Sequence, residues 1–225
     1  MKMNISTKID HTLLKADATI EQIEQLCQEA AKYKFATVCI NPHYIALGAK
    51  LLKESSTKVC TVIGFPLGAN KTAVKLFEAI QAIEDGAEEV DYVLNISDVK
   101  NGEFEAVLQE MIQFVNIKKN HPKLVIKIIL ETCYLTNDEI TKVSLLARKA
   151  GLDYVKTSTG FGTDGATQEA VRLMKKAVGD NVKVKASGGV RTATDAAAYI
   201  ELGVERIGTS NGISILEGVA PTSNY

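Results

Sequence analysis

The sequence predicts a (β/α)8 barrel, in which eight parallel strands close into a ring and helices surround them. Eight short apolar runs alternate with seven amphipathic helical stretches, and no long linker interrupts them. The chain has 225 residues, which is close to the length of about 250 that is typical of this barrel. We therefore predict a single domain over residues 1–225, with a short irregular tail over about 218–225.

An open, doubly wound sheet is the alternative architecture for such an alternation of elements. That fold carries a glycine-rich turn after its first strand. The residues at the end of the first predicted strand, Asp10 to Lys15, contain no glycine. The closed barrel is therefore the preferred prediction.

The individual elements follow from hydrophobic periodicity and from capping residues. Short runs rich in Val, Ile or Tyr mark the strands, and apolar residues at helical spacing mark the helices. Thr136 and Glu139 form a capping-box pattern, and Gly86, Gly151 and Gly203 follow helix ends. In chain order the predicted elements are strand 8–11, helix 19–33, strand 36–40, helix 42–53, strand 58–63, helix 71–85, strand 89–95, helix 103–119, strand 124–130, helix 137–150, strand 154–156, helix 168–178, strand 183–186, helix 194–202 and strand 206–208.

Composition and charge argue against several classes of protein. The chain carries 26 basic and 27 acidic side chains, and it has no basic run of the kind that binds nucleic acid. No apolar stretch approaches a membrane span, since the longest, residues 124–130, is broken by Lys127. The first residues lack the apolar segment of a secretory signal. We expect a small-molecule substrate, with neither nucleic acid nor a membrane as partner.

Cysteine and histidine spacing predicts no metal site. The four cysteines form no close pair and no metal-ligand spacing, and the three histidines are scattered. We expect the cysteines to be reduced thiols, with Cys39 packing in the core, and the protein to be cytoplasmic.

Two lysines at the ends of consecutive predicted strands form the most informative pattern for function. Lys156 and Lys185 each end an apolar run that turns into a loop of small residues and glycine. A second ammonium about 5 Å away disfavours protonation of a lysine by roughly 3 kcal/mol at an effective dielectric near 20. The pair could therefore supply a neutral amine that attacks a carbonyl. The alternative is that one or both are barrel-interior lysines paired with acids.

Other polar residues lie on the same predicted face, where the strands of a barrel end. Asp91, on the fourth strand, could pass protons to and from the lysines, or could form a structural salt bridge to Lys127 or Lys185. Lys127 interrupts an apolar strand and is expected to point into the barrel as an electrostatic support. Asp10 lies at the end of the first strand, and Cys39 near the end of the second.

Two glycine-bearing loops are candidates for phosphate binding. Ser187-Gly-Gly-Val-Arg follows the seventh strand and Gly208-Thr-Ser-Asn-Gly the eighth, and Gly160 follows the sixth. Such loops present backbone N–H groups at helix starts, and barrels commonly bind phosphate at this corner. The alternative is that each loop is only a tight turn between a strand and a helix.

Long motifs of the chain resemble those of the deoxyribose-phosphate aldolase family of class I aldolases. They occur in the family's order along nearly the whole length. The matching segments are residues 9–14 (IDHTLL), 38–42 (VCINP), 61–68 (TVIGFPLG), 86–91 (GAEEVD), 129–133 (ILETC), 155–161 (VKTSTGF), 184–192 (VKASGGVRT) and 206–210 (RIGTS).

The resemblance implies a reaction and the residues that carry it. The family cleaves 2-deoxyribose 5-phosphate reversibly to acetaldehyde and glyceraldehyde 3-phosphate, through a lysine Schiff base and without a metal or another cofactor. Lys156 matches the family's Schiff-base lysine, and Asp91 and Lys185 match the residues that donate and accept protons in the family's reaction. Gly188, Gly189 and Ser210 fall in the family's phosphate-binding loops, and with Gly160 and Gly208 from the loop pattern they form the predicted phosphate-binding set. The predicted supporting set is Asp10, Cys39, Lys127, Thr157 and Tyr225, and Tyr225 is included because some members carry a C-terminal tyrosine that assists proton transfer.

The resemblance also implies partners, and it leaves two alternatives for function. The expected partners are a sugar phosphate, small aldehydes and further copies of the chain in a dimer or a tetramer, with a role in deoxyribose phosphate catabolism. A different Schiff-base aldolase or a transaldolase-like enzyme would transfer dihydroxyacetone in place of acetaldehyde. A non-catalytic sugar-phosphate sensor would bind deoxyribose 5-phosphate without turning it over.

Overall fold

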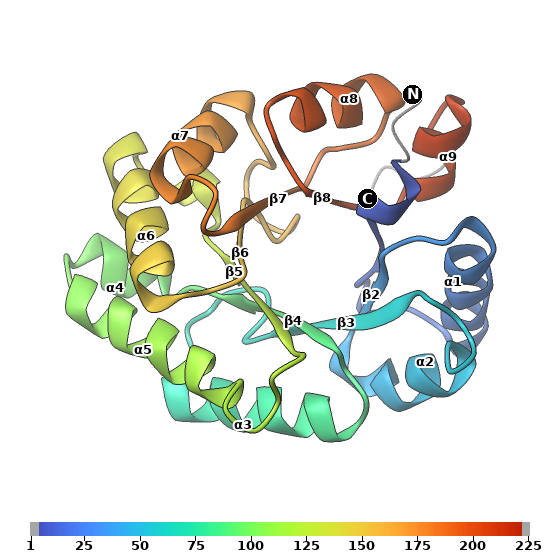
Figure 1. Cartoon of the computed structure of the whole chain (residues 1–225), viewed down its shortest axis with the longest axis horizontal. Helices are drawn as coiled ribbons and strands as arrows, with labels where there is room; N and C mark the ends of the chain where they lie inside the picture. Colours follow the sequence, from blue (N-terminus) through green and yellow to red (C-terminus); the bar gives the residue numbers. More distant parts are fainter. Residues whose placement is uncertain (1–4, 222–225) are drawn as a thin grey trace.

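The computed structural model describes residues 5–221, which form a closed barrel of eight parallel strands inside a ring of helices (Figure 1). Neighbouring strands pair in chain order, and the last pairs back with the first. The predicted fold class is therefore confirmed. The strands are β1 (Ile9–Leu13), β2 (Thr37–Ile40), β3 (Lys58–Ile63), β4 (Glu89–Val93), β5 (Val125–Ile129), β6 (Tyr154–Lys156), β7 (Lys183–Ser187) and β8 (Arg206–Thr209).

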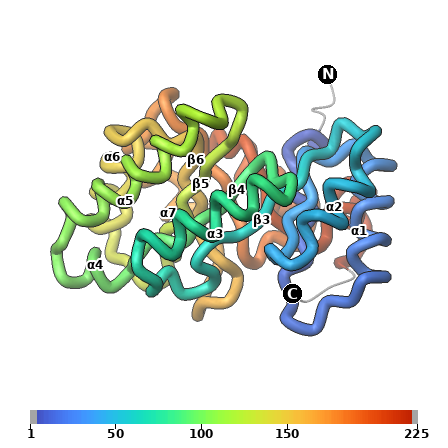
Figure 2. The backbone as a smooth tube through the Cα atoms, turned by 90° about the horizontal axis from the view of Figure 1, so that it is seen from below, coloured from blue at the N-terminus to red at the C-terminus, as the bar shows by residue number. Residues whose placement is uncertain are grey.

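Helices lie on the outer side of the strands, as the view at right angles also shows (Figure 2). Within the described residues, no helix is long and apolar enough to cross a membrane. The α-helices are α1 (Ile20–Tyr33), α2 (Ile45–Leu51), α3 (Thr72–Glu84), α4 (Ile96–Lys100), α5 (Phe104–Ile117), α6 (Asn137–Ala150), α7 (Gln168–Val178), α8 (Ala193–Glu201) and α9 (Gly212–Glu217), and the 3₁₀ turns are η1 (Ser6–Lys8), η2 (Pro42–Tyr44) and η3 (Thr132–Tyr134).

The capping residues act as their types predict. The Thr136 hydroxyl accepts a hydrogen bond from the Glu139 N–H at 3.2 Å, and the Glu139 carboxylate accepts one from the Thr136 N–H at 2.7 Å. At the other end of α6, Gly151 takes the left-handed conformation with φ 84°. Helix α6 therefore begins and ends where the sequence predicts.

Three differences from the predicted elements have local causes. β4 ends at Val93, two residues early, because Asn95 already caps the short helix α4. The helix predicted over 42–53 divides into η2 and α2, since Tyr44 has φ −102° and ψ 4° and breaks the helical geometry. Helix α9, which ends at a left-handed Gly218, was not predicted because six residues show little periodicity.

The alternation of side chains along each strand separates an apolar exterior from a polar interior. On β4, Tyr92 faces outward and stacks on Phe114 of α5, with ring centroids 3.7 Å apart. Its neighbour Asp91 therefore points inward. The same alternation turns Lys127 on β5 and Lys185 on β7 into the barrel, where both are fully buried. Charged residues on separate strands thus meet inside the barrel.

A second buried charge pair lies outside the barrel, between α3 and α5. The Lys75 ammonium is fully buried and lies 3.0 Å from a carboxylate oxygen of Glu110 and 2.9 Å from the Val93 carbonyl oxygen. Burial lowers the pKa of Lys75, and the Glu110 carboxylate acts against that shift. The pair therefore anchors α3 to both α5 and the end of β4.

Glu110→Ala is expected to lower the free energy of unfolding by about 3 to 5 kcal/mol, because it leaves a buried ammonium without its partner. Lys100→Ala is the control, since Lys100 pairs with Glu139 at the surface, with 42% of the lysine side chain exposed; it should cost at most about 1 kcal/mol. Urea unfolding measures both. Equal losses in the two variants would contradict the anchoring role of Glu110.

Candidate active site

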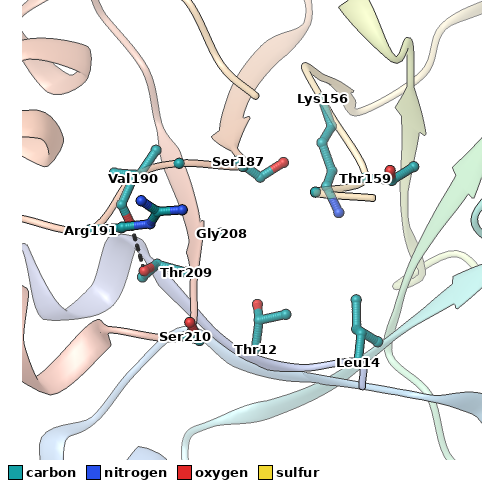
Figure 3. A pocket seen from close by; sticks show the side chains of 13 residues that line it. Thr12, Leu14, Lys156, Thr159, Ser187, Val190, Arg191, Gly208, Thr209 and Ser210 are labelled. Atoms are coloured by element: carbon teal, nitrogen blue, oxygen red, sulfur yellow. Dashed lines mark hydrogen bonds between the residues drawn. The ribbon is translucent and has the colours of Figure 1, made fainter. Parts of the chain in front are cut away.

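A cavity of about 180 Å³ opens at the carboxyl ends of the strands, between β1, β6, β7 and β8 (Figure 3). Lys156 points into it from β6, and the loops after β7 and β8 form the opposite side. The lining residues are Thr12, Leu14, Lys156, Thr159, Gly160, Ser187, Gly188, Gly189, Val190, Arg191, Gly208, Thr209 and Ser210. Six residues of the predicted site lie in this lining: Lys156, Gly160, Gly188, Gly189, Gly208 and Ser210.

The two lysines of the sequence pattern are direct neighbours in the sheet, because Lys156 and Lys185 are register partners of β6 and β7. A carboxylate joins them. Asp91 Oδ2 lies 2.9 Å from the Lys156 Nζ and 2.7 Å from the Lys185 Nζ. Lys156 is 3% exposed, whereas Lys185 and Asp91 are fully buried. Lys156, Lys185 and Asp91 therefore form a triad below the cavity, in which both ammonium groups contact the same carboxylate oxygen.

The triad continues downward into a network of ion pairs. Asp91 Oδ1 lies 2.8 Å from Lys127, which also contacts Glu89 at 2.5 Å. Lys185 contacts Asp10. The network closes through Arg206, whose guanidinium lies 2.6 Å from Asp10 and 3.0 Å from Glu89. The members are Asp10, Glu89, Asp91, Lys127, Lys156, Lys185 and Arg206.

Neighbouring charges fix the ionisation of the inner members. Burial acts to raise the pKa of Asp91, but the ammonium groups of Lys127, Lys156 and Lys185 hold it well below its usual value. Burial acts to lower the pKa of Lys185, but Asp10 and Asp91 raise it above the usual value. The Asp10 and Asp91 carboxylates thus favour the charged form of Lys185 beside Lys156.

The cavity wall opposite Lys156 is built from backbone and hydroxyl groups. Gly188 and Gly189 have φ values of 79° and 77°, which a residue with a side chain rarely adopts. Thr209 donates a hydrogen bond to the Val190 carbonyl at 2.7 Å and so joins the two loops. The predicted glycine loops therefore form one continuous corner.

Gly208 has a further reason to lack a side chain. A Cβ at this position would lie 2.9 Å from the Ser187 Cβ and 3.0 Å from the Lys185 Cε. Its small size therefore preserves the position of Lys185 as well as the opening of the corner.

The predicted supporting residues lie below or beside the cavity, and none of those described lines it. The Thr157 hydroxyl donates to the Ser187 carbonyl at 3.0 Å and accepts from the Ser187 N–H at 3.1 Å, which ties β6 to β7. Asp10 and Lys127 belong to the buried network. Cys39 is fully buried beside Cys60. Tyr225 lies outside the described residues.

Cys39, Cys60 and Asp91 also have ligand atoms within 4.8 Å of one another. Asp91 already accepts hydrogen bonds from three lysines. We therefore assign the three residues no metal-binding role.

Several residues of the site were not predicted from the sequence. Glu89 and Arg206 lie at the start of their strands, on the side away from the cavity, so strand-end reasoning could not find them. Ser187, Val190 and Arg191 lie inside the predicted glycine loop after β7, and Thr209 lies inside the one after β8; their positions in these loops are the signal that would have included them. The other unpredicted lining residues are Thr12, Leu14 and Thr159.

Comparison with known proteins identifies close relatives. The model of the DeoC/LacD family aldolases matches residues 5–218. A deoxyribose-phosphate aldolase of Thermoanaerobacter sp. (strain X514) is 56% identical over 215 residues, 96% of each chain. A deoxyribose-phosphate aldolase of Geobacillus sp. (strain WCH70) is 54% identical over 225 residues, 100% of both chains.

Solved structures of aldolases share the fold along nearly the whole chain. One described as QR15, an aldolase, has a TM-score of 0.89 at 42% identity and covers 96% of this chain and 95% of its own. The tetrameric deoxyribose phosphate aldolase from Aeropyrum pernix has a TM-score of 0.87 at 36% identity and covers 95% of this chain and 89% of its own.

Proposed function

The chain belongs to the DeoC/LacD family of aldolases and is a carbon–carbon lyase, and from this premise we propose that it cleaves 2-deoxy-D-ribose 5-phosphate reversibly to acetaldehyde and D-glyceraldehyde 3-phosphate through a Schiff base on Lys156. One observation carries the proposal. The Lys156 amine enters a cavity whose opposite wall suits a phosphate, and it shares a carboxylate with a second lysine, Lys185.

The contacts of the buried network support Lys156 as the attacking amine. Lys156 contacts one of its carboxylates, whereas Lys127 and Lys185 each contact two. Of these three lysines, Lys156 is the one that lines the cavity, where its amine can meet a substrate carbonyl.

The proposed reaction begins with covalent attack by Lys156. The Lys156 amine attacks C1 of the open-chain aldehyde, and loss of water gives an iminium. The iminium accepts the electron pair of the C2–C3 bond as a base takes the C3 hydroxyl proton, which releases glyceraldehyde 3-phosphate and leaves an enamine. Reprotonation of C2 and hydrolysis release acetaldehyde and restore the amine.

We assign the proton transfers to Asp91 and Lys185, through a water molecule. Lys127 and Asp10 hold these two groups in place and fix their charges. Because the iminium withdraws electrons as a metal would, the proposed reaction requires no metal or other cofactor.

The phosphate is assigned to the corner formed by Gly160, Gly188, Gly189, Gly208 and Ser210. Two consecutive glycines with positive φ expose backbone N–H groups there, and α8 begins a few residues later. The distance from this corner to Lys156 would fix which carbon of the sugar meets the amine.

A cleavage assay that couples glyceraldehyde 3-phosphate to a dehydrogenase tests the proposed function. Rapid cleavage of 2-deoxyribose 5-phosphate, and synthesis with acetaldehyde as the donor, are expected. Transfer of dihydroxyacetone in place of acetaldehyde would support a transaldolase-like enzyme. Tight binding of 2-deoxyribose 5-phosphate without any turnover would support a non-catalytic sensor.

Arg191→Ala is expected to raise the KM for 2-deoxyribose 5-phosphate by about 10-fold, because a charged hydrogen bond to phosphate contributes roughly 1.5 to 3 kcal/mol. Arg191 lines the cavity at the glycine corner. Unphosphorylated 2-deoxyribose is the control substrate, and its kcat/KM should stay unchanged. An equal loss for both sugars would mean that Arg191 acts on the fold of the loop and not on the phosphate.

The proposed enzyme acts in the catabolism of deoxyribose phosphate in the cytoplasm, which suits cysteines that form no disulfide in residues 5–221. We also propose a homo-oligomer, a dimer or a tetramer, since the relative from Aeropyrum pernix is described as tetrameric. Light scattering on the purified protein measures the oligomeric state.

A further inference from the structure

Glu131 is a buried carboxylate that the proposed reaction does not use. It lies two residues after the end of β5 and is 2% exposed. Its backbone has φ 54° and ψ 63°, the left-handed conformation that costs energy for a residue with a side chain. Strained backbone of this kind persists where the surrounding structure holds it, often at functional sites.

The Glu131 side chain holds the loop that follows Lys156. Its two carboxylate oxygens accept hydrogen bonds from the Thr159 N–H at 3.2 and 3.3 Å, and one of them also accepts from the Thr159 hydroxyl. The Thr159 hydroxyl in turn accepts a hydrogen bond from the Phe161 N–H at 3.0 Å. A chain of hydrogen bonds thus runs from Glu131 through Thr159 to Phe161.

The next loop residue packs directly over the same carboxylate. A Cβ on Gly162 would lie 3.1 Å from the Glu131 Cδ and 2.8 Å from the Cys133 Sγ. The loop therefore closes onto Glu131 along residues 159–162. A side chain at position 162 would push the loop away from Glu131.

The backbone on either side of Glu131 is joined to the backbone around Lys156. The Leu130 N–H donates to the Lys156 carbonyl at 2.9 Å, and the Thr132 N–H donates to the Thr157 carbonyl at 3.0 Å. Glu131 lies between these two bonds, and its side chain adds the third connection, to Thr159. These contacts from residues 130–132 therefore fix the path of the chain after β6.

Thr159 and Gly160 line the cavity together with Lys156, and Figure 3 shows Lys156 and Thr159 on the same side of it. Burial raises the pKa of the Glu131 carboxyl, and the Thr159 hydrogen bonds and the positive charge of Lys156 act against that shift. Glu131 is thus close enough to Lys156 to interact with it electrostatically, although its hydrogen bonds go to the loop.

We propose that Glu131 is a positioning residue for the aldol reaction: by holding Thr159, it keeps the loop after β6 as a rigid wall against which the Lys156 amine and its iminium are oriented. This role presupposes the proposed Schiff-base reaction. Because four of the five residues assigned to the phosphate belong to the loops after β7 and β8, and only Gly160 to the loop that Glu131 holds, loss of Glu131 should act more on the chemical steps than on phosphate binding.

The test compares Glu131→Ala with Glu131→Gln and measures kcat, KM and the rate at which borohydride traps acetaldehyde on Lys156. Glu131→Ala is expected to lower kcat and the trapping rate by about 10- to 100-fold, the usual effect of misplacing a reactive group by about 1 Å. KM should change less than kcat, since four of the five residues assigned to the phosphate lie outside the loop that Glu131 holds. Glu131→Gln keeps an acceptor for the Thr159 N–H and should recover most of the rate.

Glu205→Ala is the matched control. Glu205 accepts a hydrogen bond from the Val184 N–H at 2.9 Å and pairs with Lys175 at 2.8 Å, but at the opposite end of the barrel. It should lower the thermal midpoint without changing kcat. An equal fall in kcat in Glu205→Ala would mean that lost stability, and not positioning, explains the result.

Further outcomes separate this role from the proposed function. Wild-type kcat and trapping rate in Glu131→Ala would overturn the positioning role, while a wild-type protein that traps no acetaldehyde would overturn the Schiff base itself. If Glu131→Ala does not fold, Thr159→Val tests the side-chain part of the same contact, because it removes the hydroxyl that donates to Glu131 and accepts from the Phe161 N–H. A trapping rate reduced at least 3-fold in Thr159→Val supports the role, and an unchanged rate contradicts it.

Discussion

Replacing Lys156 with alanine is expected to lower kcat/KM for 2-deoxyribose 5-phosphate by about 10⁴-fold or more, because among residues 5–221 Lys156 is the one lysine that lines the cavity and can form the iminium there. Lys156→Arg should be equally inactive. It restores a positive charge beside Asp91, but a guanidinium does not lose its proton and cannot attack the aldehyde. The coupled cleavage assay measures both variants.

Lys183→Ala is the control for this experiment, since Lys183 lies two residues before Lys185 and is exposed. It should retain wild-type activity. If Lys156→Ala kept more than about 1% of the wild-type rate while remaining folded, covalent catalysis at Lys156 would be excluded as the main route.

Replacing Asp91 with asparagine is expected to lower kcat by about 10³-fold, the usual contribution of a proton-transferring group. It should also cost about 3 to 5 kcal/mol of stability, because three buried lysines lose their shared carboxylate. Glu110→Gln is the control, since it weakens a different buried pair, and it should lose stability but keep kcat. A kcat unchanged in Asp91→Asn would contradict the proton-transfer role.

The stability effect of Asp91→Asn should depend on pH in a defined direction. The lysines hold the pKa of Asp91 in the folded protein well below its usual value. A carboxylate of this kind stabilises the folded state above its unfolded pKa of about 3.9 and loses that contribution as the pH falls. At pH 7, urea unfolding should therefore give a lower free energy of unfolding for Asp91→Asn than for the wild type. This difference in free energy should shrink below about pH 4.

The fold could be predicted from the sequence because a parallel barrel repeats one local pattern. Apolar runs such as residues 58–63 and 154–156 are buried on both sides, and the structure confirms their bounds. Short helices escaped prediction for the opposite reason. The five residues of α4 contain too little periodicity to signal a helix, and their geometry depends on the loop that follows β4.

The strand-end residues of the candidate site were predicted from the sequence, whereas the contacts of Asp91 depend on closure of the barrel and were left open. Lys156 and Lys185 were expected to be neighbours, and they are. Asp91 was left open between proton transfer and a salt bridge. In the structure it contacts Lys127, Lys156 and Lys185 together, which only closure of the barrel brings about.

The backbone conformation and the contacts of Glu131 could not be predicted from the sequence. Its place after an apolar run marks it as a polar strand-end residue, but nothing in the sequence gives its left-handed backbone or its hydrogen bonds to Thr159, 28 residues further along the chain. Such contacts depend on how the loops after β5 and β6 pack, and the positioning role could be inferred only from the structure.

Trapping of the covalent intermediate tests the central claim, that Lys156 forms the Schiff base, most directly. The wild-type protein is treated with a low concentration of acetaldehyde and with borohydride, and its peptides are analysed by mass spectrometry. An ethyl group is expected on Lys156 well before any exposed lysine such as Lys183 carries one, and Lys156→Arg should show none at that position. Rapid modification at Lys185 or Lys127, or no adduct at all in an active enzyme, would contradict the claim.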